Sequence, residues 1–298
     1  MSAPSSPLPV RDANAALATA RSFLFVPANR PERFAKALAS GAHAVIIDLE
    51  DAVAPADKAL ARVQLADAFR QLAAPERARL LVRINASGTP WHDDDLKLLQ
   101  LLAAQGLAGV MLPKAETAAD LQRVARAVGP ACALLPLVES VAGLDAADAL
   151  AGAPQVLRLA FGNLDFQADA GLACGPDEAE LVPVRLAVVL ASRRASLVAP
   201  VDGVTPGTQD SVQLQMDAAR SRRGGFGAKL CIHPAQVASV NAAFAPGEAE
   251  LAWAQRVLGA FEAAGGGVFS LDGRMVDGPV VRLARQTLAA ARASTDGR

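Results

Sequence analysis

The feature of this sequence that most constrains its fold is an alternation of short apolar runs with helix-type segments. The runs are near-continuous, as is typical of parallel strands covered on both faces. Eight such strand–helix units over about 220 residues have the count and length of a (β/α)8 barrel. The predicted strands are residues 22–27, 43–49, 80–84, 109–113, 134–140, 156–165, 197–202 and 228–232. Between them we predict helices over 31–40, 57–72, 91–104, 117–128 (capped by Thr117), 178–194 and 210–223, and another from about residue 234.

A doubly wound open sheet is the main alternative to the barrel. Such a sheet often carries a G-x-G-x-x-G turn after its first strand, but this chain has Pro-Ala-Asn-Arg-Pro over residues 27–31. The glycine cluster at 224–227 precedes a strand, where it is expected to turn the chain rather than cradle a pyrophosphate. The expected fold class is therefore α/β, a TIM barrel with a C-terminal helical extension.

The barrel accounts for residues 20–245 and leaves a segment at each end. Residues 1–19, rich in Ser, Pro and Ala, are expected to form a flexible leader. Residues 246–298 are expected to form a helical extension, with helices over 248–264 and 280–291 around a short hairpin or loop at 265–278. This extension is expected to pack on the barrel or a neighbouring subunit, or to act as a lid.

Composition excludes several classes of partner. The chain has 298 residues, 52% of them hydrophobic, with a formal charge of −1 and a pI near 6.3, which gives no case for nucleic-acid binding. No apolar run approaches the roughly 18 residues of a membrane span, and no signal peptide is recognised at the N-terminus. The three cysteines, Cys132, Cys174 and Cys231, form no metal-type cluster and fit reduced side chains in a cytoplasmic protein.

Polar side chains follow every predicted strand. In a barrel of this type the active site lies at the C-terminal strand ends, so these residues are its candidates. Several carboxylates on one rim repel one another unless a cation or arginines lie among them. In chain order the candidates are Asn29, Arg30, Asp48, Glu50, Asp51, Arg83, Asn85, Lys114, Glu116, Glu139, Asn163, Asp165, Asp202 and His233.

Glu139 and Asp165 end two successive apolar runs and form the candidate metal site. Two carboxylates with no neighbouring histidine or cysteine suit a hard ion, Mg²⁺ before Mn²⁺, and argue against zinc. Taken singly, each acid could instead cap a helix or form a salt bridge.

Three other rim residues have open interpretations. Arg83 either binds a substrate anion or forms a salt bridge with Asp48 or Glu50 on the adjacent strand. His233 either caps the loop before Pro234 or takes part in catalysis. Lys114 is a weak candidate nucleophile, because no motif with adjacent cations supports it.

The ordered motifs resemble the citrate lyase beta subunit-like proteins of the HpcH/HpaI aldolase family. The resemblance runs from about residue 21 to 291 and rests on eight stretches. They are Phe-Val-Pro-Ala-Asn-Arg-Pro at 25–31, Asp-Leu-Glu-Asp-Ala-Val at 48–53 with Lys58 and Arg62, Val-Arg-Ile-Asn at 82–85 with Gly-Thr-Pro-Trp at 88–91, Leu-Pro-Lys at 112–114, Pro-Leu-Val-Glu-Ser at 136–140, Phe-Gly-Asn-Leu-Asp at 161–165, Ile-His-Pro at 232–234, and Asp-Gly-Arg-Met-Val-Asp at 272–277.

The resemblance implies a trimer or hexamer that handles CoA or acyl-carrier thioesters of hydroxy acids. By matching motif, Glu139 and Asp165 become Mg²⁺ ligands, and Arg83 binds the carboxylate of a 2-oxo acid, with Asn29 and Arg30 as further substrate-binding residues. Glu50 and Asp51 order metal-bound water or substrate. Asp277 corresponds to an acid that some thioester-cleaving relatives place over a neighbour's active site.

The expected activity is Mg²⁺-dependent carbon–carbon cleavage, or the reverse condensation, of a short 3-hydroxyacyl-CoA such as citramalyl-CoA or malyl-CoA. The alternatives are a class II aldolase acting on free hydroxy-oxo acids, a carrier-protein-dependent citryl lyase subunit of a complex, and a thioesterase using the same site. Two departures from the family pattern bear on the substrate. Leu164 stands where many relatives have an acid. The sequence Gly-Gly-Phe-Gly-Ala-Lys at 224–229 matches the family's usual glycine-aspartate-glycine-lysine turn only loosely.

Overall fold

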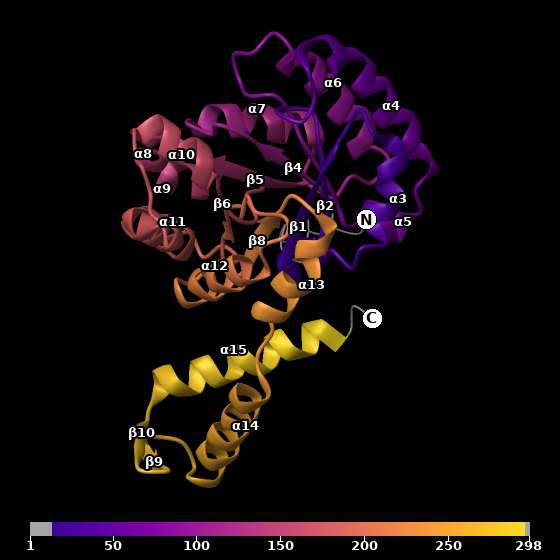
Figure 1. Cartoon of the computed structure of the whole chain (residues 1–298). Helices are drawn as coiled ribbons and strands as arrows, with labels where there is room; N and C mark the ends of the chain where they lie inside the picture. The colour runs from indigo at the N-terminus through magenta and orange to yellow at the C-terminus, as the bar shows by residue number, and fades with distance from the viewer. Residues whose placement is uncertain (1–13, 296–298) are drawn as a thin grey trace, which may run out of the picture. The chain divides into compact units, whose positions relative to one another are not determined.

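The computed structural model describes residues 14–295 and shows a closed barrel of eight parallel strands (Figure 1). The strands follow one another in chain order around the barrel, and β1 closes it by pairing with β8. This confirms the fold class predicted from the sequence. Among the described residues, no helix combines the length and the apolar character needed to cross a membrane.

The first compact unit runs from residue 1 to 243 and contains the barrel. Its described elements are α2 (Ala15–Thr19), β1 (Ser22–Pro27), η1 (Pro31–Arg33), α3 (Phe34–Leu38), β2 (Ala44–Asp48), η2 (Pro55–Asp57), α4 (Lys58–Gln71), α5 (Ala74–Arg77), β3 (Leu80–Arg83), α6 (His92–Ala103), β4 (Gly109–Leu112), α7 (Ala118–Val128), β5 (Ala133–Val138), α8 (Val141–Asp145), α9 (Ala147–Ala151), β6 (Ala160–Phe161), α10 (Asn163–Ala170), η3 (Ala179–Leu181), α11 (Val182–Arg194), β7 (Val201–Asp202), α12 (Ser211–Arg223), β8 (Ala228–Cys231) and α13 (Pro234–Ala243).

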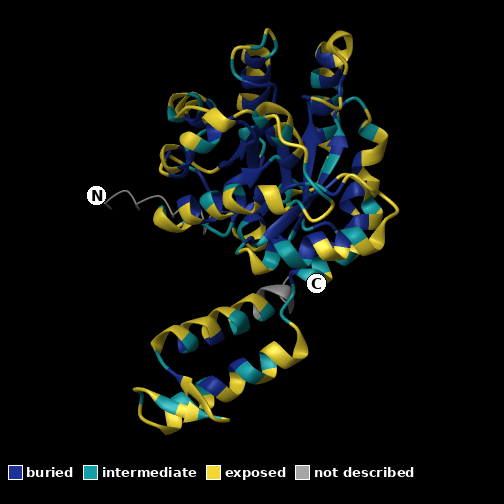
Figure 2. Ribbon diagram, turned by 60° about the vertical axis from the view of Figure 1, so that its left-hand side comes forward, coloured by how far each residue is buried: buried dark blue, intermediate teal, exposed yellow. Residues whose placement is uncertain are grey.

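The strands are buried on both faces, which explains their continuous apolar runs. All five residues of β2 are buried, and the strands of the barrel unit are dark blue in Figure 2 while the outward faces of the helices are yellow. The register pairs Pro27 with Asp48, and Asp48 with Arg83. The C-terminal ends of the first three strands therefore reach the same level, and their polar residues share one rim.

Helix α2 closes the N-terminal end of the barrel. Leu17 is fully buried in the same apolar cluster as Phe23 and Leu81, and a Cβ on Gly109, which begins β4, would lie only 3.0 Å from Leu17 Cδ1. Residues 15–19 of the predicted leader are therefore part of the barrel unit, because Leu17 gains a buried apolar site there. Residues 1–13 of that predicted leader lie outside the described residues.

Arg158 links α2 to the barrel through hydrogen bonds. Its side chain is 1% exposed, and it donates to the carbonyls of Ala199 (2.8 Å), Leu17 (3.2 Å) and Ala20 (2.7 Å). Burial lowers the pKa of Arg158 to about 9. The guanidinium thus lies in an apolar region, where carbonyl oxygens solvate its charge.

We expect Arg158→Met to lower the free energy of unfolding by about 1–3 kcal/mol, because it leaves buried carbonyls without donors. Urea unfolding measures this loss, and faster proteolysis at residues 15–19 reports the release of α2. Arg194→Met is the control, because Arg194 and its partner Asp148 are both more than half exposed and such pairs contribute about 0.2–1 kcal/mol. Equal losses in the two variants would contradict the role given to Arg158.

The structure differs from the sequence prediction most at the sixth and seventh strands. β6 and β7 are only two residues long each, and helix α10 begins directly after Gly162. Asp165 therefore lies in the first turn of a helix, not at the end of a strand. An apolar run can lie buried in irregular backbone as well as in a strand: Val156 forms a single bridge with Leu134, and residues 157–159 are irregular and buried. Helices α8, α9 and α10 were not predicted.

The second compact unit, residues 244–298, is described by itself. It contains α14 (Glu248–Ala263), a hairpin of β9 (Phe269–Leu271) and β10 (Arg274–Val276), and α15 (Gly278–Thr295). The hairpin turns at Asp272 and Gly273, both with positive φ, as an Asp-Gly turn favours. The unit has a small apolar core of its own, formed by Ala254, Val257, Val276, Val281 and Ala284.

Candidate active site

Asp48 and Arg83 form the base of the rim. Arg83 donates from Nε and Nη2 to the two Asp48 oxygens at 2.7 and 2.6 Å, and its guanidinium lies 4.8 Å from the Phe25 ring centroid. Asp48 also accepts from the backbone N–H groups of Glu50 and Ala52. Arg83 therefore forms a salt bridge with Asp48, and Asp48 fixes the orientation of the guanidinium.

The remaining nitrogen of Arg83 faces two further acids. Nη1 lies 2.9 Å from Glu50 Oε2 and 3.3 Å from Asp51 Oδ2. Burial lowers the pKa of Arg83, but the Asp48 and Glu50 carboxylates outweigh it and raise that pKa above its ordinary value. Arg83 is thus a permanent cation whose Nη1 points at the more exposed part of the rim, since the Asp51 side chain is 60% exposed.

Lys114 links Glu50, which follows β2, to Glu139, which follows β5. Its ammonium donates to Glu50 Oε1 at 2.7 Å, and its backbone N–H donates to Glu139 Oε1 at 2.8 Å. The backbone has φ +46° at this residue, a left-handed conformation that is strained for a side chain such as lysine. Burial lowers the pKa of Lys114, but Glu50 raises it more, so the net pKa is raised and the amine stays protonated. This argues against Lys114 as a nucleophile.

Glu139 is the most deeply buried acid of the candidate metal pair. It is 3% exposed at the end of β5, and desolvation, followed by the charge of Glu50, raises its pKa to about 8. A Cβ on Gly162 would lie 2.6 Å from Glu139 Cβ, so the backbone at the end of β6 packs directly on this side chain. Only glycine at position 162 leaves Glu139 in this position.

Asp165 lies on the exposed first turn of α10, and its charge helps to raise the pKa of Glu139. Within residues 14–295, no three His, Cys, Asp or Glu side chains are clustered as a preformed metal site. Mg²⁺ needs no such cluster, because it is often held by one or two carboxylates while waters and substrate complete its octahedron. The buried Glu139 carboxylate, facing the charge of Asp165, fits a hard divalent cation.

We expect the stability of the metal-free protein to fall as pH rises from about 5 to 8. The folded state holds the Glu139 proton with a pKa of about 8, against an ordinary value of 4.5, so it binds more protons than the unfolded state in this range. Glu139→Gln removes this contribution, worth up to about 1.4 kcal/mol per pH unit. Urea unfolding in EDTA at pH 5, 6, 7 and 8 measures it; parallel curves for wild type and Glu139→Gln would contradict it.

A second polar network joins the end of β7 to the side chain of Lys229 within β8 and was not predicted. Asp202 accepts from Arg185 Nε at 3.0 Å, and Lys229, fully buried, donates to the Gly203 carbonyl at 2.7 Å. Arg185 also donates to Glu178, which precedes α11. Only Asp202 carried a sequence signal, as a polar residue at a strand end, because its partners come from segments far away in the chain.

The remaining predicted residues lie in different surroundings. Asn29 is half-buried, while Arg30 is exposed and forms a 3.8 Å ion pair with Glu32. His233 is exposed, and its Nδ1 accepts from the Ala235 N–H at 3.2 Å, as its loop-capping interpretation predicts. Asp277 belongs to the second unit, where its carboxylate accepts from the Val280 N–H at 3.3 Å in the first turn of α15. The structure therefore joins Glu50, Asp51, Arg83 and Glu139 in one cluster.

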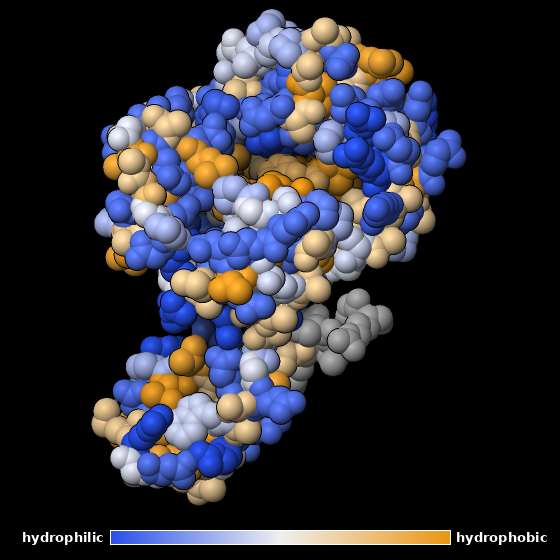
Figure 3. Space-filling model, viewed as in Figure 1, coloured by the Kyte–Doolittle hydropathy of each residue, from blue (hydrophilic) through white to orange (hydrophobic). Residues whose placement is uncertain are grey.

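Figure 3 shows the barrel unit hollowed near its middle, with hydrophobic residues at the floor and many hydrophilic residues around it. A closed barrel with carboxylates and a fixed arginine at its C-terminal strand ends is the arrangement of a (β/α)8 enzyme.

Comparisons with known proteins identify the family. The model of the HpcH/HpaI aldolase/citrate lyase family matches residues 21–234. A citrate lyase subunit beta-like protein of Deinococcus radiodurans is 40% identical over 286 residues, covering 93% of this chain and 99% of that protein. A (3S)-malyl-CoA thioesterase of Cereibacter sphaeroides is 35% identical over 276 residues, covering 92% and 95%.

The solved structures agree with this result. The crystal structure of CitE from Mycobacterium tuberculosis, in complex with magnesium, acetoacetate and coenzyme A, superposes with a TM-score of 0.79 at 37% identity, covering 92% of this chain and 99% of that one. The chain therefore belongs to the HpcH/HpaI aldolase/citrate lyase family, as its motifs predicted. It is a citrate lyase beta subunit-like enzyme of the lyase class.

Proposed function

We propose that the protein is a Mg²⁺-dependent lyase that cleaves a short 3-hydroxyacyl-CoA, with citramalyl-CoA and malyl-CoA as the leading substrates, to acetyl-CoA and a 2-oxo acid. The observation that carries this proposal is the buried Glu139 carboxylate, coupled to the charge of Asp165 and linked through Lys114 and Glu50 to the fixed Arg83. Support comes also from the CitE structure that contains magnesium, acetoacetate and coenzyme A.

The roles of the residues follow from the chemistry. Glu139 and Asp165 hold the ion, which when bound polarises the substrate oxygens and stabilises negative charge developing there. Arg83, oriented by Asp48, binds the carboxylate of the 2-oxo acid portion through Nη1. Glu50 and Asp51 order the substrate on either side of that nitrogen. Asn29 and Arg30, after β1, are proposed to contact the thioester.

The bond that breaks joins the hydroxyl-bearing carbon to the carbon next to the thioester. The hydroxyl proton passes to solvent, the oxygen becomes the carbonyl of the 2-oxo acid, and the electron pair of the broken bond forms a thioester enolate. Asp277, which takes up a proton from solvent, delivers it to the carbon of this enolate to give acetyl-CoA. In the condensation direction the same carboxylate removes that proton.

The direct test incubates the purified protein with citramalyl-CoA and malyl-CoA, with Mg²⁺ or with EDTA, and follows acetyl-CoA and 2-oxo acid. EDTA-sensitive release of both products supports the lyase. Release of free CoA together with the intact hydroxy acid would instead identify a thioesterase, the activity named for the Cereibacter sphaeroides relative. Turnover of free hydroxy-oxo acids alone would favour an aldolase, and turnover of a carrier-protein thioester alone would favour a citryl lyase subunit.

We further propose that the enzyme acts in the cytoplasm as a homotrimer or hexamer in which Asp277 serves the site of a neighbouring copy. Asp277→Asn is then expected to lower turnover about 10²-fold, because a proton transfer loses its donor. Mixing this variant with Asp165→Asn after subunit exchange restores part of the activity, since each copy supplies what the other lacks. No recovery in the mixture would show that Asp277 acts within its own chain or not at all.

A further inference from the structure

Asn163 makes a two-point contact with the backbone that follows β7. Its Oδ1 accepts from the Val204 N–H at 2.9 Å, and its Nδ2 donates to the Val204 carbonyl at 3.2 Å and to Glu178 Oε1 at 2.8 Å. The side chain is 1% exposed. An amide carries a donor and an acceptor together, so it can satisfy both polar groups of one residue of the chain.

Close packing confines Asn163 further. A Cβ on Gly203 would lie 2.1 Å from Asn163 Oδ1, so the backbone at the end of β7 leaves no space beside this amide. Glu178 is itself fixed, because its other oxygen accepts from Arg185 and, at 2.8 Å, from Arg220. Asn163 is thus held between two rigid segments.

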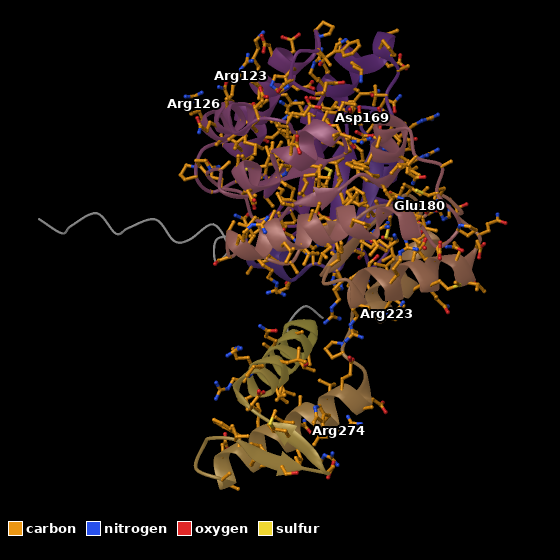
Figure 4. All side chains as sticks on the ribbon, turned by 90° about the vertical axis from the view of Figure 1, so that its left-hand side faces the viewer. Arg123, Arg126, Asp169, Glu180, Arg223 and Arg274 are labelled. Atoms are coloured by element: carbon orange, nitrogen blue, oxygen red, sulfur yellow. The ribbon has the colours of Figure 1, made fainter. Side chains whose placement is uncertain are left out.

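The segment around Asn163, from Gly162 to the first turn of α10, lies next to both proposed metal ligands. Gly162 packs on Glu139, and Asp165 follows Asn163 by two residues in the first turn of α10. Within residues 14–295, no hydrogen bond or ion pair holds the Asp165 carboxylate itself. The far end of α10 is fixed separately, because Asp169, labelled in Figure 4, accepts from the Val141 N–H at 2.8 Å. The direction of Asp165 therefore depends on where the first turn of α10 lies.

We propose that Asn163 is a positioning residue of the divalent-cation site: by locking the start of α10 to Val204 and Glu178, it aims Asp165 at the cation that Glu139 shares. This inference rests on the proposed metal site and adds a residue to it. Groups behind metal ligands that fix their orientation typically affect metal affinity 10–100-fold.

The test measures Mg²⁺ affinity by calorimetry, without substrate, in Asn163→Ala and in Gln167→Ala. Gln167 lies one turn further along α10 and donates to the Asn163 carbonyl at 3.1 Å and to Glu178 at 3.5 Å, so it is a matched control that touches the same first turn and leaves the Val204 contact intact. Asn163→Ala is expected to weaken Mg²⁺ binding 10–100-fold, and Gln167→Ala less than threefold. Thermal unfolding of the metal-free variants shows whether each is folded at the assay temperature.

Gly203→Ala provides a second perturbation that removes no polar group. Its methyl would overlap the Asn163 amide, since the Cβ position lies 2.1 Å from Oδ1, and it is expected to weaken Mg²⁺ binding by a similar factor. If both folded variants bind Mg²⁺ as wild type does while Asp165→Asn does not, the positioning role is refuted and the metal site stands. If wild type itself binds no Mg²⁺, the proposed function fails first. If Asn163→Ala does not fold, the result for Gly203→Ala decides.

Discussion

Replacing Asp165 by asparagine is expected to weaken Mg²⁺ binding by roughly 10²-fold or more and to reduce Mg²⁺-dependent turnover to background. This loss exceeds the 10–100-fold loss of metal affinity that is typical when a residue orienting a ligand is replaced. The substitution removes one of two anionic ligands and keeps the size of the side chain. Because the Asp165 side chain is exposed and no hydrogen bond within residues 14–295 holds it, the free energy of unfolding of the metal-free protein should change little. Calorimetric titration with Mg²⁺ and urea unfolding measure the two effects.

Asp169→Asn is the matched control for this experiment. Asp169 is another exposed aspartate on α10, one turn further along, where it accepts from the Val141 N–H. It is expected to keep Mg²⁺ affinity within about twofold of wild type, because a change of one charge at the surface is largely screened. An Asp165→Asn protein that binds Mg²⁺ as tightly as Asp169→Asn would remove Asp165 from the metal site.

Replacing Arg83 by lysine is expected to weaken the binding of a 2-oxo acid, with pyruvate as the probe, by about 10²-fold in the presence of Mg²⁺. Lysine keeps the positive charge, but it cannot hold both Asp48 oxygens and also present Nη1 toward Glu50 and Asp51. Mg²⁺ affinity should stay within about threefold, which separates this variant from Asp165→Asn. Calorimetry with pyruvate in saturating Mg²⁺ measures the loss.

A second substitution at this position tests how the rim is held together. Arg83→Met is expected to cost about 3–5 kcal/mol of folding stability, since buried Asp48 loses its cation and buried Glu50 keeps only its contact with Lys114. Arg62→Lys is the control for Arg83→Lys, because it also replaces an arginine of an ion pair by lysine. Arg62 pairs with Asp95 on α6 and is not part of the rim cluster. If pyruvate binding falls equally in Arg62→Lys and Arg83→Lys, the loss reflects general destabilisation instead of a lost carboxylate contact.

Much of the fold was predictable because the barrel imposes a simple pattern. Eight parallel strands buried on both faces need eight apolar runs, and the connecting helices must fit between them. The prediction was wrong where the backbone leaves that pattern: Gly162 ends the sixth strand early, and α10 starts at Asn163. Apolar residues at 156–159 are buried whether or not they pair as a strand, so their sequence could not distinguish the two cases.

The rim was predictable in part for the same reason. Strand ends of a closed barrel meet at one level, so Glu50, Arg83 and Glu139 could be grouped by counting strands. The contacts that shape the site were not predictable. The left-handed backbone of Lys114 occurs without glycine, and the contact between Asn163 and Val204 joins residues 41 positions apart. The roles of the grouped residues remain predictions for the experiments above.

The docking of α2 has a practical consequence for anyone who immobilises or fuses this enzyme. Leu17 and Arg158 fix α2 on the N-terminal end of the barrel, while the carboxylates and Arg83 lie at the C-terminal strand ends. A bead, sensor surface or partner enzyme attached ahead of residue 14 therefore joins the barrel at the end opposite the rim. The first described residue of the chain is thus separated from the rim by the length of the barrel strands.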